Sequence, residues 1–313
     1  MEGRRLGWLL LLWLLCPAAE AARIALLIDE FPPAYQRVVD DVAASIGGTL
    51  RVSQSDWVTL RDIGSDTAPS AVSDWLRSAK PEAIIALGAV SAERCAELAP
   101  STPCLVSAVA GPPLGHAAGL PGVSFISSAR AALETLRLLD IEVKRIWTVY
   151  QPSEDQWLID DARRHLAVGV ELHAITVDDL KLATRQLAQA LARSEVGDAV
   201  WLPANPRLVS ARYTLPFLID ESWKRRVPIV SSTLSHVRLG VLAATFPDPK
   251  ALGERLAQQA ARLAHGAAVP SQLMPLEDVQ RALNMRTARH LGLSLSEGVL
   301  RQFVLKFPLE GTP

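Results

Sequence analysis

Two short apolar runs that bracket an amphipathic segment constrain the fold of this chain more than any other feature. The runs are residues 199–202 and 228–230, and the segment between them, about residues 209–223, repeats its apolar side chains at helical spacing. Parallel strands cannot be joined by a tight turn and need a crossover, usually a helix. The stretch 197–245 therefore predicts a βαβ unit. Ligands bind beyond the carboxyl ends of strands in open parallel sheets, so it also predicts a binding edge.

The same alternation runs along the rest of the chain. Continuous apolar runs, such as residues 23–28 and 83–87, are typical of buried parallel strands. Residues 34–46 are predicted as a helix closed by Gly47 and Gly48, with a strand at residues 49–52. The Gly/Pro-rich stretch 111–122 interrupts the series and is the best candidate for a domain boundary. The pattern predicts an α/β protein with two Rossmann-like lobes, each built on a parallel sheet.

Composition and motifs narrow the function class. Hydrophobic residues make up 49% of the 313 residues, charged residues 21%, and the net charge is −1, which suits a globular chain without a nucleic-acid footprint. The sequence has no H-E-x-x-H, G-x-G-x-x-G, P-loop or G-x-S-x-G motif, and its six histidines are scattered. Asp29 and Glu30 are adjacent and would point differently, so they do not form an acid–base pair. We expect no metal, no cofactor and no enzymatic activity.

The N-terminus resembles an export signal. Arg4 and Arg5 precede an apolar run, residues 6–16, which is shorter than the about 20 residues that span a bilayer. Ala19-Glu20-Ala21 fits the small-x-small cleavage pattern. We therefore predict a signal peptide at residues 1–21 and a periplasmic, soluble mature chain beginning at Ala22. An uncleaved anchor is the alternative, and the short run argues against it.

Export makes the two cysteines of the mature chain, Cys95 and Cys104, a candidate disulfide. Cys95 falls on a predicted helix and Cys104 at the start of the next strand, so the two could meet across the turn. Two buried thiols that pack as small hydrophobes explain the same residues equally well. The sequence leaves both alternatives open.

Several segments resemble one family, the ABC-transporter substrate-binding proteins, whose known members include tryptophan- and tyrosine-binding proteins. The segments are Trp201-Leu-Pro-Ala-Asn-Pro206, Val227-Pro-Ile-Val230, Gly240-Val-Leu-Ala-Ala244 and the tail Leu283-Asn284-Met-Arg286-Thr287-Ala288-Arg-His-Leu291-Gly292-Leu293. The resemblance covers nearly the whole mature chain, and the tail segment is the most specific. It implies the type I periplasmic binding fold, with a three-strand hinge between two lobes that close on a ligand.

The resemblance also implies an organisation and partners. Crossings between lobes are expected near residues 122–124, near 239–241 and within 270–279. The N-terminal lobe would hold residues 22–122 and about 241–275, and the C-terminal lobe residues 123–240 and about 276–313. A monomer would capture a small ligand, aromatic or amino-acid-like, and deliver it to the membrane permease of an ABC importer. The alternative is a ligand-sensing adaptor for a membrane sensor, and an extracytoplasmic enzyme is the least supported reading.

If the lobes face each other, strand ends and helix starts line the cleft. The expected residues are Asp29, Glu30, Phe31, Gly88, Ala89, Ser91, Ser107 and Ala108 in one lobe, and Tyr150, Gln151, Pro203, Ala204, Asn205, Ser231, Ser232 and Thr233 in the other. Backbone N–H groups after Gly88 would suit an anion, and Phe31 and Tyr150 would stack on a flat ligand. Ser91 also fits a plain N-cap, Tyr150 fits packing between lobes, and Trp157 is a further aromatic candidate. The other tryptophans fit core or surface packing.

Asn205 departs from the family pattern. Family members often carry an acidic residue there, which could accept a hydrogen bond from a ligand ammonium, whereas asparagine carries no charge. The departure weighs against an amino-acid ligand unless Asp29 and Glu30, on the opposite lobe, supply the negative charge.

Overall fold

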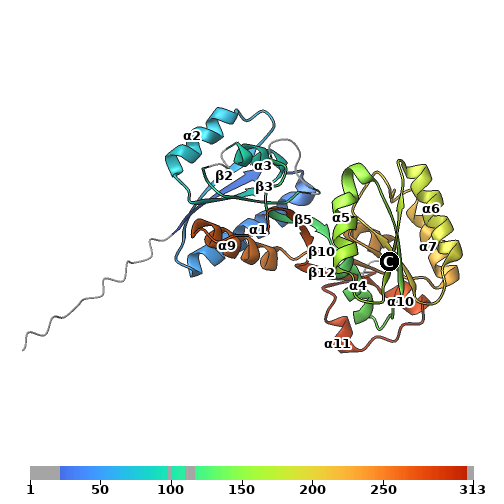
Figure 1. The fold of residues 1–313 in the computed structure, drawn as a ribbon. Helices are drawn as coiled ribbons and strands as arrows, with labels where there is room; N and C mark the ends of the chain where they lie inside the picture. Colours follow the sequence, from blue (N-terminus) through green and yellow to red (C-terminus); the bar gives the residue numbers. More distant parts are fainter. Residues whose placement is uncertain (1–21, 98–100, 110, 112–116, 309–313) are drawn as a thin grey trace, which may run out of the picture.

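The computed structural model describes residues 22–97, 101–109, 111 and 117–308, so the predicted signal peptide lies outside the described residues. The chain forms two lobes side by side, each with one sheet between helices (Figure 1). We call the lobe with the six-stranded sheet the N-lobe and the lobe with the seven-stranded sheet the C-lobe. Both sheets are mostly parallel, which confirms the predicted α/β class.

The N-lobe sheet has the strand order β11-β5-β4-β3-β1-β2. Its elements are β1 (Arg23–Asp29), α1 (Pro33–Val52), β2 (Asp56–Ile63), α2 (Pro69–Ala79), β3 (Ala83–Leu87), α3 (Ala89–Ala96), β4 (Cys104–Ser107), β5 (Gly122–Ser127), α9 (Pro249–Ala264) and β11 (Leu273–Leu276). Helix α9 comes late in the sequence but packs its buried Leu252 and Leu256 into the same cluster as Ile24 and Leu26 of β1.

The C-lobe sheet has the order β13-β12-β10-β9-β8-β6-β7, and the β10–β12 pair is antiparallel. Its elements are α4 (Ala129–Leu138), β6 (Arg145–Tyr150), α5 (Pro152–His165), β7 (Glu171–Thr176), α6 (Leu180–Arg193), β8 (Asp198–Leu202), α7 (Leu215–Arg225), β9 (Ile229–Ser231), α8 (Leu234–Leu239), β10 (Ala243–Pro247), β12 (Val279–Asn284), α10 (Met285–His290), α11 (Glu297–Leu300) and β13 (Leu305–Phe307). Strands β8 and β9 pair in parallel with α7 between them in sequence, so the βαβ prediction is confirmed.

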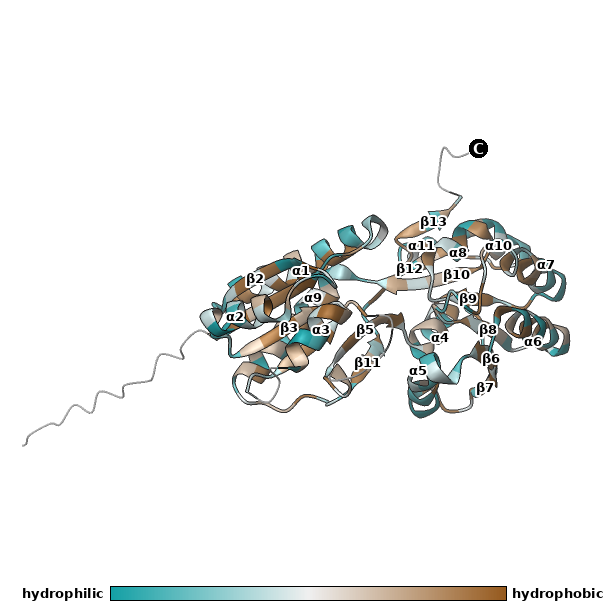
Figure 2. Cartoon of the chain, turned by 90° about the horizontal axis from the view of Figure 1, so that it is seen from above, coloured by the Kyte–Doolittle hydropathy of each residue, from teal (hydrophilic) through white to brown (hydrophobic). Residues whose placement is uncertain are grey.

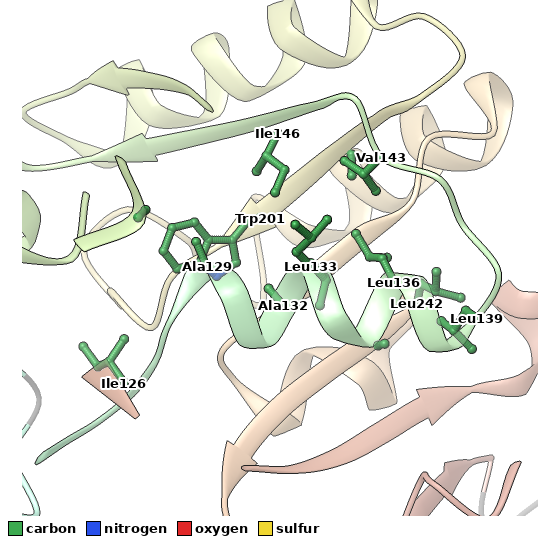
Figure 3. Packing of buried hydrophobic residues seen from close by; sticks show 14 of the residues in the cluster. Ile126, Ala129, Ala132, Leu133, Leu136, Leu139, Val143, Ile146, Trp201 and Leu242 are labelled. Atoms are coloured by element: carbon green, nitrogen blue, oxygen red, sulfur yellow. The ribbon is translucent and has the colours of Figure 1, made fainter. Parts of the chain in front are cut away.

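Apolar side chains of helices and strands meet in several buried clusters. In the C-lobe, α4 turns Leu133 and Leu136 toward the sheet strands that carry Ile146 and Trp201 (Figure 3). Hydrophilic residues gather on helices such as α2, α6 and α7, while the strands are mainly hydrophobic (Figure 2). Burial of these apolar faces stabilises each lobe by removing hydrocarbon surface from water.

The chain passes between the two sheets after Ser127, after Pro247 and after Leu276. The first two crossings lie later than residues 122–124 and 239–241. Strand β5 pairs with β11 as far as Ser127 before the chain leaves the N-lobe, and β10 first pairs with β9 and β12 in the C-lobe. The third crossing, between β11 and β12, lies at the end of the range 270–279. The lobe boundaries therefore fall at strand ends and not at the Gly/Pro-rich stretch.

Hydroxyl groups hold the first two crossings together. The Ser127 Oγ lies 2.6 Å from the Thr245 Oγ1 and donates to the Ser232 Oγ at 2.8 Å. The Trp201 Nε1 also donates to the Ser232 Oγ, at 3.3 Å. Ser127 and Thr245 are buried, so these bonds are shielded from water and fix how the strands enter the C-lobe.

The structure joins Cys95 of α3 and Cys104 of β4 in a disulfide, with a Cα–Cα distance of 6.3 Å across nine residues of sequence. Both side chains are buried. Of the two alternatives that the sequence leaves open, the structure has the bonded one.

Replacing both cysteines by alanine is expected to lower the free energy of unfolding by about 2–3 kcal/mol, because a short closed loop restricts the unfolded chain. Denaturant unfolding of Cys95→Ala/Cys104→Ala beside the oxidised wild type measures the loss. The intact mass of the wild type should rise by two hydrogen atoms after reduction. An unchanged mass, together with a midpoint that does not respond to reductant, would contradict the disulfide.

Candidate ligand-binding site

A cleft of about 900 Å³ lies between the lobes. We call it the interlobe cleft. Its lining residues are Asp29, Phe31, Ala89, Glu93, Ala108, Val109, Gly111, Ala117, Ile126, Pro152, Ser153, Glu154, Asp155, Gln156, Trp157, Ala204, Asn205 and Pro206. Most of them lie at or after the carboxyl ends of β1, β4, β6 and β8 or in the first turns of α3 and α5. The site thus stands where open parallel sheets bind ligands.

Asp29 ends β1 and caps the start of α3. Its carboxylate accepts hydrogen bonds from the backbone N–H groups of Val90 at 2.9 Å and Ser91 at 2.8 Å, and from the Ser91 hydroxyl. Burial raises the pKa of Asp29, while the three hydrogen bonds oppose that rise. The helix N-terminus that we expected to hold a ligand anion is therefore already occupied by a side chain of the protein.

Gly88 makes that arrangement possible. Its φ is +120°, and a Cβ built there would lie 2.1 Å from the Asp29 Oδ2. Only glycine tolerates both the backbone conformation and the close approach. Ser91 lies inside α3, whose N-cap is Gly88, so Ser91 is not the N-cap.

Asp155, in the first turn of α5, organises the opposite wall of the cleft. Its Oδ2 accepts hydrogen bonds from the Gln151 N–H at 3.0 Å and from the Asn205 Nδ2 at 2.8 Å. The Asn205 Nδ2 also lies 3.2 Å from the Glu154 Oε2, and its Oδ1 accepts from the Arg207 N–H. Burial raises the pKa of Asp155 above its ordinary value, and the hydrogen bonds from Gln151 and Asn205 offset only part of that rise. Asn205 thus bridges two carboxylates of the C-lobe.

Two aromatic rings line the cleft from opposite lobes. Phe31 follows β1 and packs against the N-lobe core. Trp157, on α5 of the C-lobe, donates from its Nε1 to the Glu154 carbonyl at 3.1 Å and contacts an N-lobe cluster that contains Val109 and Ala117. The rings supply flat apolar surfaces on which part of a ligand can rest.

Of the residues that we predicted for the site, six line the cleft: Asp29, Phe31, Ala89, Ala108, Ala204 and Asn205. The others do not: Glu30, Gly88, Ser91, Ser107, Tyr150, Gln151, Pro203, Ser231, Ser232 and Thr233. Gly88, Ser91 and Gln151 instead support the lining aspartates. Because the structure holds no ligand, contact of any of these residues with one remains a prediction.

The remaining predicted residues serve packing or are placed outside the wall. Tyr150 is buried in the C-lobe core, and the Ser107 Oγ donates to the Val123 carbonyl at 2.8 Å. Glu30 is exposed and Pro203 is buried. Ser231, Ser232 and Thr233 lead into α8, a helix that we did not predict. There the Ser231 Oγ lies 2.9 Å from the Nδ1 of His236, whose pKa burial lowers to about 4.

Sequence reasoning missed most of the C-lobe wall and part of the N-lobe wall. The missed lining residues are Glu93, Val109, Gly111, Ala117, Ile126, Pro152, Ser153, Glu154, Asp155, Gln156 and Pro206. Trp157, which we kept as a further aromatic candidate, does line the cleft. The signal that could have found Glu154 and Asp155 is their position in the first turn of a helix that directly follows a buried strand.

The family model for ABC transporter substrate binding proteins matches residues 64–304. The chain belongs to this family. A tyrosine-binding protein of Clostridioides difficile (strain R20291) is 22% identical over 289 residues, which cover 83% of this chain and 78% of that protein. A ligand-free, open substrate-binding protein with adhesive properties from Clostridium difficile has a similar fold, with a TM-score of 0.62 and 15% identity, covering 91% of this chain and 99% of that chain. The predicted type I periplasmic binding fold is confirmed.

Membrane-spanning helices and metal-binding clusters are both absent from the residues that the structure describes. None of the helices there is both long and apolar enough to span a membrane. Within the same residues, no group of three or more histidine, cysteine, aspartate or glutamate side chains is arranged to hold a metal ion.

Proposed function

We propose that this family member is an extracytoplasmic solute-binding protein that captures a small ligand between its lobes and delivers it to an ABC importer. The observation that carries the proposal is the interlobe cleft, which takes lining residues from both lobes and includes Ile126 of β5, next to the first crossing. Rotation about crossings after Ser127, Pro247 and Leu276 would close both walls on a ligand, a known motion of periplasmic binding proteins. The protein would act without catalysis.

Periplasmic location rests on the predicted signal peptide and on the family. A relative named for tyrosine binding supports a small-molecule ligand of about that size. A ligand that fills much of a cleft of about 900 Å³ would bury most of its surface, as in other small-molecule sites.

Thermal unfolding with a library of amines, amino acids, sugars and organic acids tests ligand capture. A true ligand at 100 times its Kd should stabilise the protein by about 2.7 kcal/mol through mass action. Trp157→Ala should weaken that ligand, because the ring lines the cleft. Trp75→Ala, which removes a partly buried ring on α2 away from the cleft, is the matched control and should leave the affinity unchanged. A library without any stabilising compound would contradict the proposal.

Delivery to an importer is a separate step from capture. Ligand-loaded protein should stimulate ATP hydrolysis by the membrane partner that co-purifies with it. A co-purified sensor, with no ATPase present, would instead support the ligand-sensing alternative.

A further inference from the structure

We infer that the interlobe cleft takes an organic cation without a free carboxylate, an amine or guanidinium on an apolar body, in preference to a zwitterionic amino acid. The inference rests on the proposed function, because it names the chemical class that the same site would capture.

The first argument is charge. Four carboxylates line the cleft: Asp29 and Glu93 from the N-lobe, and Glu154 and Asp155 from the C-lobe. No lysine or arginine lines it within the part of the chain that the structure describes. Closure of the lobes would bring negative groups of both walls toward one ligand, so a cation gains from both walls and an anion is repelled by both.

The second argument concerns the helix N-termini, which are the usual anion sites of such a fold. At α3, the N–H groups of Val90 and Ser91 donate to Asp29, and the Ala92 N–H donates to the Gly88 carbonyl. A ligand carboxylate would have to displace the buried Asp29 to reach these donors. The start of α3 thus presents a capped end with a carboxylate facing the cleft.

At the start of α5, most of the N–H groups are likewise occupied or missing, although no side chain caps this helix. The Gln151 N–H donates to Asp155, residue 152 is a proline without an N–H, and the Glu154 and Asp155 N–H groups donate to the Gln151 carbonyl. A ligand carboxylate at this wall would meet Glu154 and Asp155 themselves. Both helix starts therefore favour a positive group.

The third argument is how the acidic groups are neutralised. Asn205 gives its Nδ2 donor to Asp155 and Glu154 but adds no charge. Arg207 pairs with Glu154 at 3.1 Å from outside the cleft wall, and its side chain is 71% exposed, so water screens that pair. Glu93 is exposed and forms no ion pair among the described residues. A cationic ligand would supply the missing counter-charge.

The rings complete the match. Trp157 and Phe31 stand in the same cleft as the four carboxylates. A tryptophan face attracts cations, and both rings bury an apolar ligand body. Burial raises the pKa of Asp29 and the pKa of Asp155. A bound cation would lower both pKa values again, because it stabilises the charged carboxylates.

Calorimetric titration with three probes of one shape tests the inference. Tyramine, L-tyrosine and 3-(4-hydroxyphenyl)propionate share a ring and differ in their charged groups, and agmatine and L-arginine form a second pair. We expect tyramine or agmatine to bind at least about tenfold more tightly than its amino acid, with no measurable binding of the propionate. Affinity for the amine should fall as salt is raised.

Two charge-removing variants and a control locate the effect. The double variant Glu93→Gln/Glu154→Gln should lower the affinity for tyramine at least about tenfold. Its affinity for L-tyrosine should stay unchanged or rise. Glu97→Gln, on the same side of the N-lobe but outside the cleft wall, should change neither probe more than about twofold. Since both replaced glutamates are at least partly exposed, the double variant should fold, and its unfolding curve checks this.

The outcomes separate the two proposals. An amino acid, sugar or organic acid that binds more tightly than its matched amine, and whose affinity Trp157→Ala lowers, would overturn the inference and keep the proposed function. If the wild-type protein binds no amine, amino acid, sugar or organic acid, both the inference and the proposed function are overturned. If the double variant lowers the affinities for tyramine and L-tyrosine equally, the inference is also overturned, because the two glutamates would then not distinguish ligands by their charge.

Discussion

Replacing Gly88 by alanine is expected to lower the free energy of unfolding by about 3 kcal/mol and to weaken ligand capture. Gly88 has φ +120° and ψ 168°, a region that is essentially limited to glycine and costs other residues about 1–3 kcal/mol. The added Cβ would also lie 2.1 Å from the Asp29 Oδ2, and such overpacking costs about 1–3 kcal/mol. Displacing Asp29 would uncap α3 and move one acidic group of the cleft.

Gly119→Ala separates the two causes. Gly119 also has a positive φ, +84°, but a Cβ built there meets no atom within 4 Å. We expect this control to lose only the backbone contribution, about 1 kcal/mol, with no change in ligand affinity. Urea unfolding and ligand titration of both variants make the comparison. Equal losses of stability in Gly88→Ala and Gly119→Ala would show that the contact with Asp29 does not matter.

The fold could be predicted where one face or one whole strand is apolar. Strands β3 and β6 and the β8–α7–β9 unit follow directly from such runs. Gly47 and Gly48 were wrong as a helix end, because α1 continues through them to Val52. A Cβ on Gly47 would lie 3.3 Å from the Trp57 ring of β2, so this glycine leaves room for a neighbouring strand. That requirement is tertiary and leaves no mark on the local sequence.

The sequence could predict at which edge of the sheets the site lies, but not which side chains line it. Strand ends correctly indicated Asp29, Phe31, Ala204 and Asn205 as lining residues. The direction of each side chain depends on packing, and Tyr150, at the end of a correctly predicted strand, turns into the C-lobe core. The acidic character of the cleft depends on Asp155 and Glu154 of α5, whose proximity to Asn205 requires the folded sheet. Sequence spacing of about 50 residues cannot reveal it.

The hydrogen bonds of Asn205 change how its missing charge is interpreted. The sequence suggested that an uncharged residue there removes the negative charge that a ligand ammonium needs. In the structure, its amide instead holds the carboxylates of Glu154 and Asp155 side by side at the same wall. Two like charges kept close repel each other, and the shared donor offsets part of that cost. The negative charge is therefore present in the wall, although residue 205 does not carry it.

Replacing Asp198 by alanine should destabilise the C-lobe by about 3 kcal/mol at neutral pH. The Asp198 carboxylate accepts from the Arg145 Nε and Nη2, each at 2.8 Å, from the Trp147 Nε1 at 3.1 Å and from the Glu195 N–H at 3.0 Å. Only 3% of the Asp198 side chain and 25% of the Arg145 side chain are exposed. Removing one partner of such a pair leaves the other desolvated and unpaired, which typically costs about 3–5 kcal/mol for full burial. Asp198→Asn should also destabilise, since its amide would place N–H donors against those of Arg145 and Trp147.

The loss should depend on pH in a defined direction. Burial raises the pKa of Asp198, but the hydrogen bonds from Arg145, Glu195 and Trp147 outweigh it and hold that pKa below its ordinary value. The group therefore stabilises the folded state fully above its unfolded pKa of about 3.9, and this contribution is lost as pH falls toward the folded pKa. Urea unfolding of wild type and Asp198→Asn from pH 7 to pH 3 should show their difference shrinking below about pH 4. Asp160→Ala removes an exposed carboxylate paired with Arg163 and should change stability by less than about 0.5 kcal/mol throughout. A wild-type advantage that stays constant to pH 3 would mean that packing, not the charge of Asp198, holds this end of the sheet.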